Sequence, residues 1–197
     1  MKQINKVEWQ PGNLLYPLPA VMVSCGSNPE EYNIITISWT GTINTSPPMV
    51  YISVRPERHS YEIIKKNKAF VINLTTDKLA YATDFNGIKS GKDMNKFQET
   101  RLTPVPTRKI NSVLIGESPV NIECKVTQII PLGSHDMFIA EVVNINVNEK
   151  LIDPKTKKLR LDKANLLSYS HGFYYILGKR IGHFGWSVKK NKSESGK

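Results

Sequence analysis

The sequence predicts a mainly β protein, a barrel of mostly antiparallel strands with a few peripheral helices. Six segments show the apolar and polar alternation or the β-branched content of strands. The loop 131–135 joins two long segments directly, as in an antiparallel hairpin, and the candidate helices are few and short. At 197 residues and 40% hydrophobic content, we expect one domain, residues 1–188, followed by a disordered basic tail, residues 189–197.

Two consecutive strands, residues 34–40 and 50–55, each carry a row of polar side chains. Successive side chains of a strand point to opposite faces, so alternate positions share a face. The polar rows are Thr36, Ser38 and Thr40 in one strand and Tyr51, Ser53 and Arg55 in the next. We expect the two rows to be neighbours on one sheet face, with Trp39 on the opposite, apolar face.

A helix, residues 60–66, follows these strands, and Ser60 is its predicted N-cap. Arg55 and Arg58 stand just before it, and free helix amides beside two guanidinium groups form an anion site that suits phosphate. Together with the hydroxyl rows, this site suits a phosphorylated ligand with a polar ring system. A solvent-facing strand with surface cations explains the same residues, and the pattern alone does not choose between the two interpretations.

The other predicted elements complete the barrel. Residues 21–25 and 69–74 form strands, and residues 76–85 and 93–99 form short helices. The last two strands are residues 120–130 and 137–147. In the strand 120–130 apolar residues alternate with polar ones, which places Cys124 on the core face, where free cysteines are most often found.

The net charge of +10 raises the alternative of a nucleic-acid-binding barrel. Many of the cations lie in the predicted tail and in a predicted loop, residues 155–163. Aromatic residues are not interleaved with these lysines, as binders of single strands require. We therefore expect solvated charge and no nucleic-acid partner, whereas the alternative predicts salt-dependent affinity for DNA or RNA.

Cysteine content and hydropathy favour a cytoplasmic protein. The two cysteines, Cys25 and Cys124, form no C-x-x-C or Cys/His cluster, so neither a disulfide framework nor a metal site is predicted. No apolar run approaches the roughly 20 residues of a membrane helix, and the start of the chain lacks a signal-peptide pattern. No membrane association is expected.

The residues around the polar strands resemble the flavin reductase-like family, in particular its flavoredoxin branch. The matching pieces are residues 33–41, Pro47, Pro48, residues 53–56, Arg58, Ser60, Tyr61, residues 70–74, residues 90–93, Lys96 and Phe97. They stand in the family's order and spacing across most of residues 10–185. The resemblance implies an FMN-binding split β-barrel of Greek-key type and a homodimer that holds the flavin near its interface.

The resemblance also implies roles for the matched positions. The residues expected along the isoalloxazine ring and ribityl chain are Thr36, Ser38, Trp39 and Thr40. Those expected around the phosphate are Ser53, Val54, Arg55, Arg58, Ser60 and Tyr61. Ser90, Gly91 and Lys92 are further cofactor-binding candidates, and Lys92 stands where relatives often carry Arg, which exchanges a bidentate contact for a point charge. Simple alternation turns Trp39 away from this face, so its role requires a bulge or a backbone contact.

The resemblance implies an NAD(P)H-dependent flavin oxidoreductase, which passes electrons from reduced nicotinamide through FMN to an acceptor. No G-x-G-x-x-G motif follows a strand, so nicotinamide is expected to stack transiently on the flavin. No protein acid or base is required, and no catalytic residue is assigned. The alternative is a flavoredoxin-like electron carrier that a protein partner reduces, without NAD(P)H activity of its own.

Three side chains are candidates for a substrate pocket. His135 lies in the hairpin loop, and His171 and Tyr174 lie in an aromatic segment, residues 168–175, that resembles one near the C-terminus of relatives. A lone histidine is more often structural or solvated, and the sequence leaves this choice open.

Overall fold

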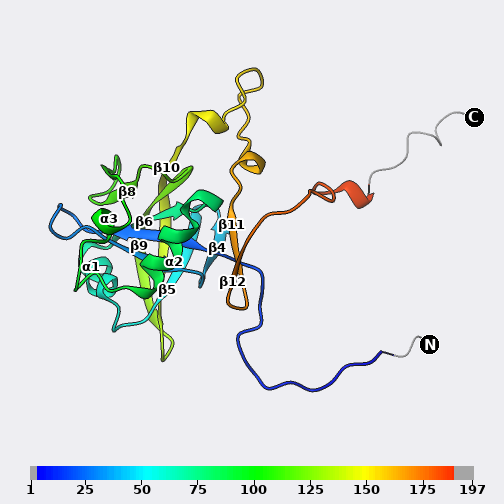
Figure 1. Cartoon of the computed structure of the whole chain (residues 1–197), viewed down its shortest axis with the longest axis horizontal. Coiled ribbons are helices and arrows are strands. Elements are labelled where there is room, and N and C mark those ends of the chain that lie inside the picture. Colours follow the sequence, from blue (N-terminus) through cyan, green and yellow to red (C-terminus); the bar gives the residue numbers. More distant parts are fainter. Residues whose placement is uncertain (1–3, 189–197) are drawn as a thin grey trace, which may run out of the picture.

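The computed structural model describes residues 4–188 and is built around a seven-stranded antiparallel sheet (Figure 1). The strand order is β3-β2-β6-β9-β10-β5-β4. The strands are β2 (Val21–Cys25), β3 (Asn33–Ile37), β4 (Thr40–Thr45), β5 (Pro48–Val54), β6 (Ala69–Leu74), β9 (Val120–Pro131) and β10 (Asp136–Val147). The predicted mainly β, antiparallel fold is confirmed.

The two edge strands of this sheet, β3 and β4, are consecutive in the chain. Only Ser38 and Trp39 separate them, so the two edges must approach each other and the sheet must roll up. The Ser53 amide of β5 donates to the Trp39 carbonyl at 2.9 Å, which ties the crossing segment to the far side of the sheet. Because β3 and β4 do not pair, the roll stays open along one line, as in a split barrel.

The main core fills the inside of this roll. Its largest fully buried side chains include Phe70, Phe138, Ile52 and Ile64. Burying each such side chain contributes about 1.5–3 kcal/mol relative to leaving it in water. Cys124 is in this core, as the alternation of its strand predicts.

In the described part of the chain, three short α-helices lie outside the sheet: α1 (His59–Asn67), α2 (Ala80–Ile88), which follows a 3₁₀ turn η1 (Asp77–Leu79), and α3 (Lys96–Glu99). Helix α2 packs on β3, and a Cβ added at Gly87 would approach the Thr36 Cβ to 3.3 Å. A second core, with Met22, Ile34 and Phe97 among its members, fills the space under α2 and α3.

Smaller elements complete the chain. The strand β1 (Leu18–Pro19) pairs with a hairpin of β11 (Leu167–Ser170) and β12 (Phe173–Ile176), and β7 (Pro104–Pro106) pairs with β8 (Val113–Ile115). Besides η1, the described residues form the 3₁₀ turns η2 (Glu149–Leu151), η3 (Leu161–Lys163) and η4 (Trp186–Val188). Figure 1 shows the N-terminal segment and the segment after β12 running away from the main sheet.

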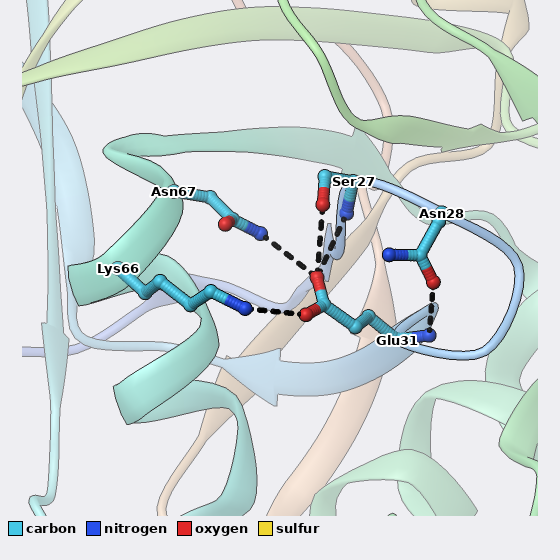
Figure 2. Close-up of polar contacts among 5 residues, drawn as sticks. All are labelled: Ser27, Asn28, Glu31, Lys66 and Asn67. Carbon is cyan, nitrogen blue, oxygen red and sulfur yellow. Dashed lines mark hydrogen bonds and ion pairs between the residues drawn. The ribbon is translucent and has the colours of Figure 1, made fainter.

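A polar cluster fastens the turn between β2 and β3 to the last turn of α1 (Figure 2). The Glu31 carboxylate accepts hydrogen bonds from Lys66 Nζ at 2.7 Å, Ser27 Oγ at 2.9 Å and Asn67 Nδ2 at 3.4 Å. These donors, with Lys66 first, lower the pKa of Glu31 to about 2. The cluster fixes the entry of β3 relative to α1, the two elements that frame the site described below.

Several predicted boundaries require correction. The strand predicted at 34–40 ends at Ile37, and a bend at Ser38 and Trp39 starts β4. The N-cap of α1 is Arg58 rather than Ser60, so the helix begins one residue earlier than predicted. The helix predicted at 76–85 is a 3₁₀ turn followed by α2, and the helix predicted at 93–99 begins only at Lys96, capped by Asn95.

Three further expectations concern the C-terminal tail, membrane-spanning segments and metal sites. The predicted tail, residues 189–197, lies outside the described residues. Within residues 4–188, no helix is long and apolar enough to cross a membrane. In the same part of the chain, no group of His, Cys, Asp and Glu side chains has the arrangement of a metal site.

Candidate functional site

The larger part of the candidate site is a cavity of about 330 Å³ where the bend between β3 and β4 faces the end of β5, helix α2 and the β11–β12 hairpin. It is lined by Ile35, Thr36, Ile37, Ser38, Trp39, Ser53, Val54, Arg55, Arg58, Asp84, Gly87, Ile88, His135, Tyr169 and Tyr174. This volume lies within the range of small-molecule sites.

A smaller cavity of about 190 Å³ adjoins it at the N-terminus of α1. Its lining is Asn33, Ile35, Glu57, Arg58, His59, Ser60, Lys89, Ser90, Gly91 and Lys96. Ile35 and Arg58 line both cavities, so the two spaces are adjacent. We call the two together the joined site.

Hydroxyl groups line the larger cavity, but for a reason that differs from the predicted one. The strands β3 and β5, which carry the hydroxyl rows, do not pair with each other, because they stand far apart in the sheet order. They meet because the sheet is rolled and Trp39 is tied to Ser53. The bend lets both Ser38 and Trp39 line the cavity, which resolves the conflict that regular alternation creates for Trp39.

Thr36 and Ser60 differ in what they can offer a ligand. The Thr36 hydroxyl donates to the Thr83 carbonyl at 2.5 Å, so only its lone pairs remain free. The Ser60 hydroxyl accepts from Asn33 Nδ2 at 2.8 Å and also contacts the Cys25 thiol. Ser60 is 1% exposed, so its reach is limited to the smaller cavity that it lines.

Gly91 permits the close approach that holds Asn33 in this position. A Cβ at residue 91 would lie 2.1 Å from Asn33 Oδ1, which is far inside contact distance. Asn33 in turn is 3% exposed and bonded to Ser60. The segment from Ser90 to Gly91 therefore has to be small where it closes the smaller cavity.

The smaller cavity is strongly cationic. Arg58, Lys89 and Lys96 line it, together with His59, whereas Glu57 is its one lining carboxylate. Glu57 is exposed and already paired with Arg55 at 3.2 Å. No side chain caps the N-terminus of α1, so the positive end of the helix dipole faces the same space. The cavity therefore favours an anion.

Two titratable side chains that line the larger cavity, Tyr174 and His135, have shifted pKa values. Tyr174 donates to Asp84 Oδ1 at 3.3 Å, and burial together with this carboxylate raises the pKa of Tyr174 to about 12. Burial, and then the charge of Arg55, lower the pKa of His135 below its usual value, so the ring is neutral at pH 7. Both side chains are consequently uncharged at neutral pH.

Four of the predicted site residues do not line the joined site. Thr40 is buried and donates to the Tyr51 carbonyl at 2.6 Å, because it pairs within the β4–β5 ladder. The Tyr61 hydroxyl donates to Asp136 Oδ2 at 2.6 Å, and its ring packs edge-on against Phe138. Lys92 is exposed and lines neither cavity.

His171 is the fourth. It is exposed at the tip of the β11–β12 hairpin, with a φ of 47°, and only its edge meets Tyr16. Its predicted companion Tyr174 and the hairpin residue His135 do line the larger cavity. The remaining predicted residues all line the joined site: Thr36, Ser38, Trp39, Ser53, Val54, Arg55, Arg58, Ser60, Ser90 and Gly91.

Sequence reasoning missed several lining residues. Asp84, Gly87 and Ile88 lie at positions i, i+3 and i+4 of α2, a spacing that places them on one helix face and could have revealed them. Tyr169 is the cross-strand partner of Tyr174, which no local pattern shows. Lys96 and Asn33 were noted only as parts of matching motifs.

These features define a class of protein: a split β-barrel with a hydroxyl-lined cavity and an adjacent cationic cavity at its open line. The family model described as "Flavin reductase like domain" matches residues 14–177, and the chain belongs to this family. An uncharacterized protein of Pyrococcus abyssi is 28% identical over 157 residues, which cover 80% of this chain and 90% of the relative.

Solved structures show the same fold. The flavoredoxin of Desulfovibrio vulgaris (Miyazaki F) is similar with a TM-score of 0.86 at 26% identity, over 94% of this chain and all of that one. An FMN-binding protein from Thermus thermophilus, solved with bound 1-cyclohex-2-enone, is similar with a TM-score of 0.75 at 20% identity, over 93% of this chain and 99% of the other.

Proposed function

We propose that the protein is an FMN-binding flavoprotein of the flavin reductase type, which transfers electrons from reduced nicotinamide through bound FMN to an acceptor. The observation that carries this proposal is the joined site, in which a hydroxyl-lined cavity lies beside a cationic one at a helix N-terminus. Membership of the flavin reductase like family and the similarity to an FMN-binding protein support a flavin with a phosphate ester.

The smaller cavity fits the phosphate. Arg58, Lys89 and Lys96 supply positive charge, the amides at the start of α1 supply N–H donors, and the Ser60 hydroxyl lines the same space. Ser90 and Gly91 close the cavity without a bulky side chain. These residues would hold the phosphate end.

The larger cavity fits the ring system and its polyol chain. Thr36 offers lone pairs, and Ser38 and Ser53 add hydroxyl groups, while Trp39, Ile35 and Ile88 provide apolar surface. We propose that these side chains orient the isoalloxazine ring and ribityl chain. Arg55, at the rim beside Ser53, is proposed as a contact of the same half.

Bound FMN would supply hydride and single-electron chemistry, and the protein's own groups bind, orient and shield it. Tyr174 stays protonated across the physiological range, so it acts as a hydrogen-bond donor rather than as an acid or base. His135 is neutral at pH 7 and can accept or donate one hydrogen bond. No catalytic acid or base is assigned.

The purified protein tests the proposal directly. We expect a yellow protein with flavin absorption bands, release of FMN on denaturation, and oxidation of NADH or NADPH in stopped-flow measurements. The variant Ser60→Ala removes one hydroxyl from the smaller cavity and should lower the flavin content. A colourless protein that does not take up added FMN would contradict the proposal.

A second candidate function is that of an electron carrier reduced by a protein partner, and the similarity to a flavoredoxin favours it. The two candidates share the cofactor and differ in the donor. Rapid flavin bleaching by NADH or NADPH supports the oxidoreductase. A protein that binds FMN but is bleached only by a chemical or protein reductant supports the carrier.

We further propose that the protein is a homodimer that works in the cytoplasm. Large apolar side chains stand exposed in the segments outside the sheet, among them Trp9, Phe173, Ile181 and Phe184. Such surface normally marks an interface. Light scattering after size exclusion should give a mass of two chains, and one chain would contradict the dimer. Both cysteines are free and buried, which fits a reducing compartment.

A further inference from the structure

Lys96 is a lysine in an unusual place. It is 2% exposed at the start of α3, and its Nζ donates to the carbonyls of Ile34 and Asn86, each at 2.8 Å. An ammonium group has three protons, so one remains. Within residues 4–188, no carboxylate forms an ion pair with it. The side chain also lines the smaller cavity of the joined site.

A buried cation without an anionic partner is costly, because it has lost water and gained only carbonyl dipoles. Burial, and then the nearby Arg58 charge, lower the pKa of Lys96 to about 8. The free protein therefore carries a mixture of charged and neutral Lys96 close to physiological pH.

The neighbouring groups do not neutralise this charge. The titratable and charged side chains that face Lys96 from β2, the start of α1 and the segments beside it are Cys25, Glu57, Arg58, His59 and Lys89. Burial raises the pKa of the Cys25 thiol to about 12, so it stays uncharged. Burial and the nearby lysines lower the pKa of His59, so it is neutral as well. Glu57 is exposed and paired with Arg55.

We propose that Lys96 makes the joined site select a flavin that carries a phosphate ester over one that does not, and that Lys96 takes up a proton as the phosphate binds. The inference rests on the proposed function, because it takes the smaller cavity as the phosphate end. A dianion in that cavity supplies the partner that the protein itself does not provide, and so favours the charged form of Lys96.

This coupling has a definite sign. Lys96 has a pKa of about 8 in the free protein, against an ordinary value of 10.5. Phosphate binding shifts the pKa back toward the ordinary value, so affinity for FMN is highest below pH 8. Above pH 8 the affinity falls, by up to about tenfold per pH unit, because free Lys96 must first be protonated. Riboflavin, which has no phosphate, should not show this loss.

Calorimetric titration of the cofactor-free full chain with FMN and with riboflavin, from pH 7.5 to 9.5, tests the inference. Each titration is repeated in two buffers of different ionisation enthalpy, so that the protons taken up are counted. We expect the uptake for FMN to approach one proton near pH 9, and none for riboflavin. This measurement on the unchanged sequence needs no variant to fold.

Two variants test whether Lys96 is the group that takes up the proton when FMN binds. Lys96→Met should lower FMN affinity at pH 7.5 by about 10–100-fold, the loss of one charged hydrogen bond, and leave riboflavin affinity within about twofold. It should also abolish proton uptake. The comparison variant Lys89→Met removes an exposed cation of the same cavity. It should weaken FMN binding equally at every pH and preserve the uptake.

The outcomes separate the inference from the proposed function. FMN binding without proton uptake, or with uptake unchanged in Lys96→Met, overturns the role of Lys96 and leaves the FMN site standing. Equal affinity for FMN and riboflavin in the unchanged sequence overturns the phosphate assignment of the smaller cavity. Binding of neither flavin overturns both.

Discussion

Replacing Arg58 by alanine tests whether the two cavities form one site. Among residues 4–188, only Arg58 and Ile35 line both, and one guanidinium nitrogen of Arg58 already donates to the Gly87 carbonyl. The guanidinium has five N–H donors, so four remain for a ligand. A hydrogen bond to a charged partner contributes about 1.5–3 kcal/mol, so each bond lost should weaken FMN binding by about 10–150-fold.

The assay is the quenching of FMN fluorescence on binding, with riboflavin titrated in parallel. We expect Arg58→Ala to weaken FMN binding much more than riboflavin binding, because the lost charge lines the cavity that we propose for the phosphate. Lys78→Ala is the matched control, since it removes an exposed cation outside both cavities. Circular dichroism melting should show at most a modest loss of stability from the missing Gly87 contact. If Arg58→Ala binds FMN as tightly as Lys78→Ala does, the assignment of the joined site is wrong.

Three further predictions concern contacts around the site and the fold. Gly91→Ala should displace Asn33, whose Oδ1 would lie 2.1 Å from the new Cβ, and weaken FMN binding by about 2–10-fold in the same fluorescence assay; unchanged affinity would mean that Asn33 does not position Ser60. Glu123→Ala should lower the free energy of unfolding, measured in urea, by about 3 kcal/mol or more, because this fully buried carboxylate accepts hydrogen bonds from two backbone amides and two asparagines. A loss below about 1 kcal/mol would show that water replaces the carboxylate. The pKa of Glu31 is lowered from its ordinary value of 4.5 to about 2, so its ionised carboxylate stabilises the fold above pH 4.5 and this contribution is lost as the pH falls toward 2. The melting temperatures of the unchanged protein and of Glu31→Gln should therefore converge over that pH range. A constant difference between them would contradict the cluster in Figure 2.

Local patterns predicted the parts of the fold that local physics decides. The strands β2 and β6 occupy the predicted residues, and β9 and β10 each extend the prediction by one residue, because alternation and β-branched content act within a single segment. The short β1, β11 and β12 were missed, since their pairing depends on partners that are distant in the chain. The same holds for Tyr169, which enters the site only through that hairpin.

The alternation of residues 34–40 predicted hydroxyl side chains that do line the larger cavity, but it predicted the wrong strand geometry for them. It predicted one strand with hydroxyls on one face, and the structure instead breaks this strand at Ser38. Regular alternation cannot show that break, since Trp39 continues the apolar period in the sequence. Lys96 illustrates the opposite limit: no local pattern marks this lysine as buried, and only the packing of α3 against β3 and α2 removes it from water.

The position of the site follows from the way the sheet closes. A seven-stranded sheet whose edge strands are separated by two residues must bring those edges together, yet β3 and β4 do not pair. The open line therefore leaves side chains of both faces accessible at one point, which is why Ile35, Thr36 and Trp39 all line one cavity although alternation assigns them to different faces. Helix α1 begins at His59, separated by four residues from the end of β5 at Val54, and its uncapped N-terminus lies at the adjacent smaller cavity. Under the proposed function, the topology brings a hydroxyl-lined cavity and a cationic one together for a ligand with a polar ring and an anionic end, and the side chains of Arg58, Ser60 and Lys96 line the cationic one.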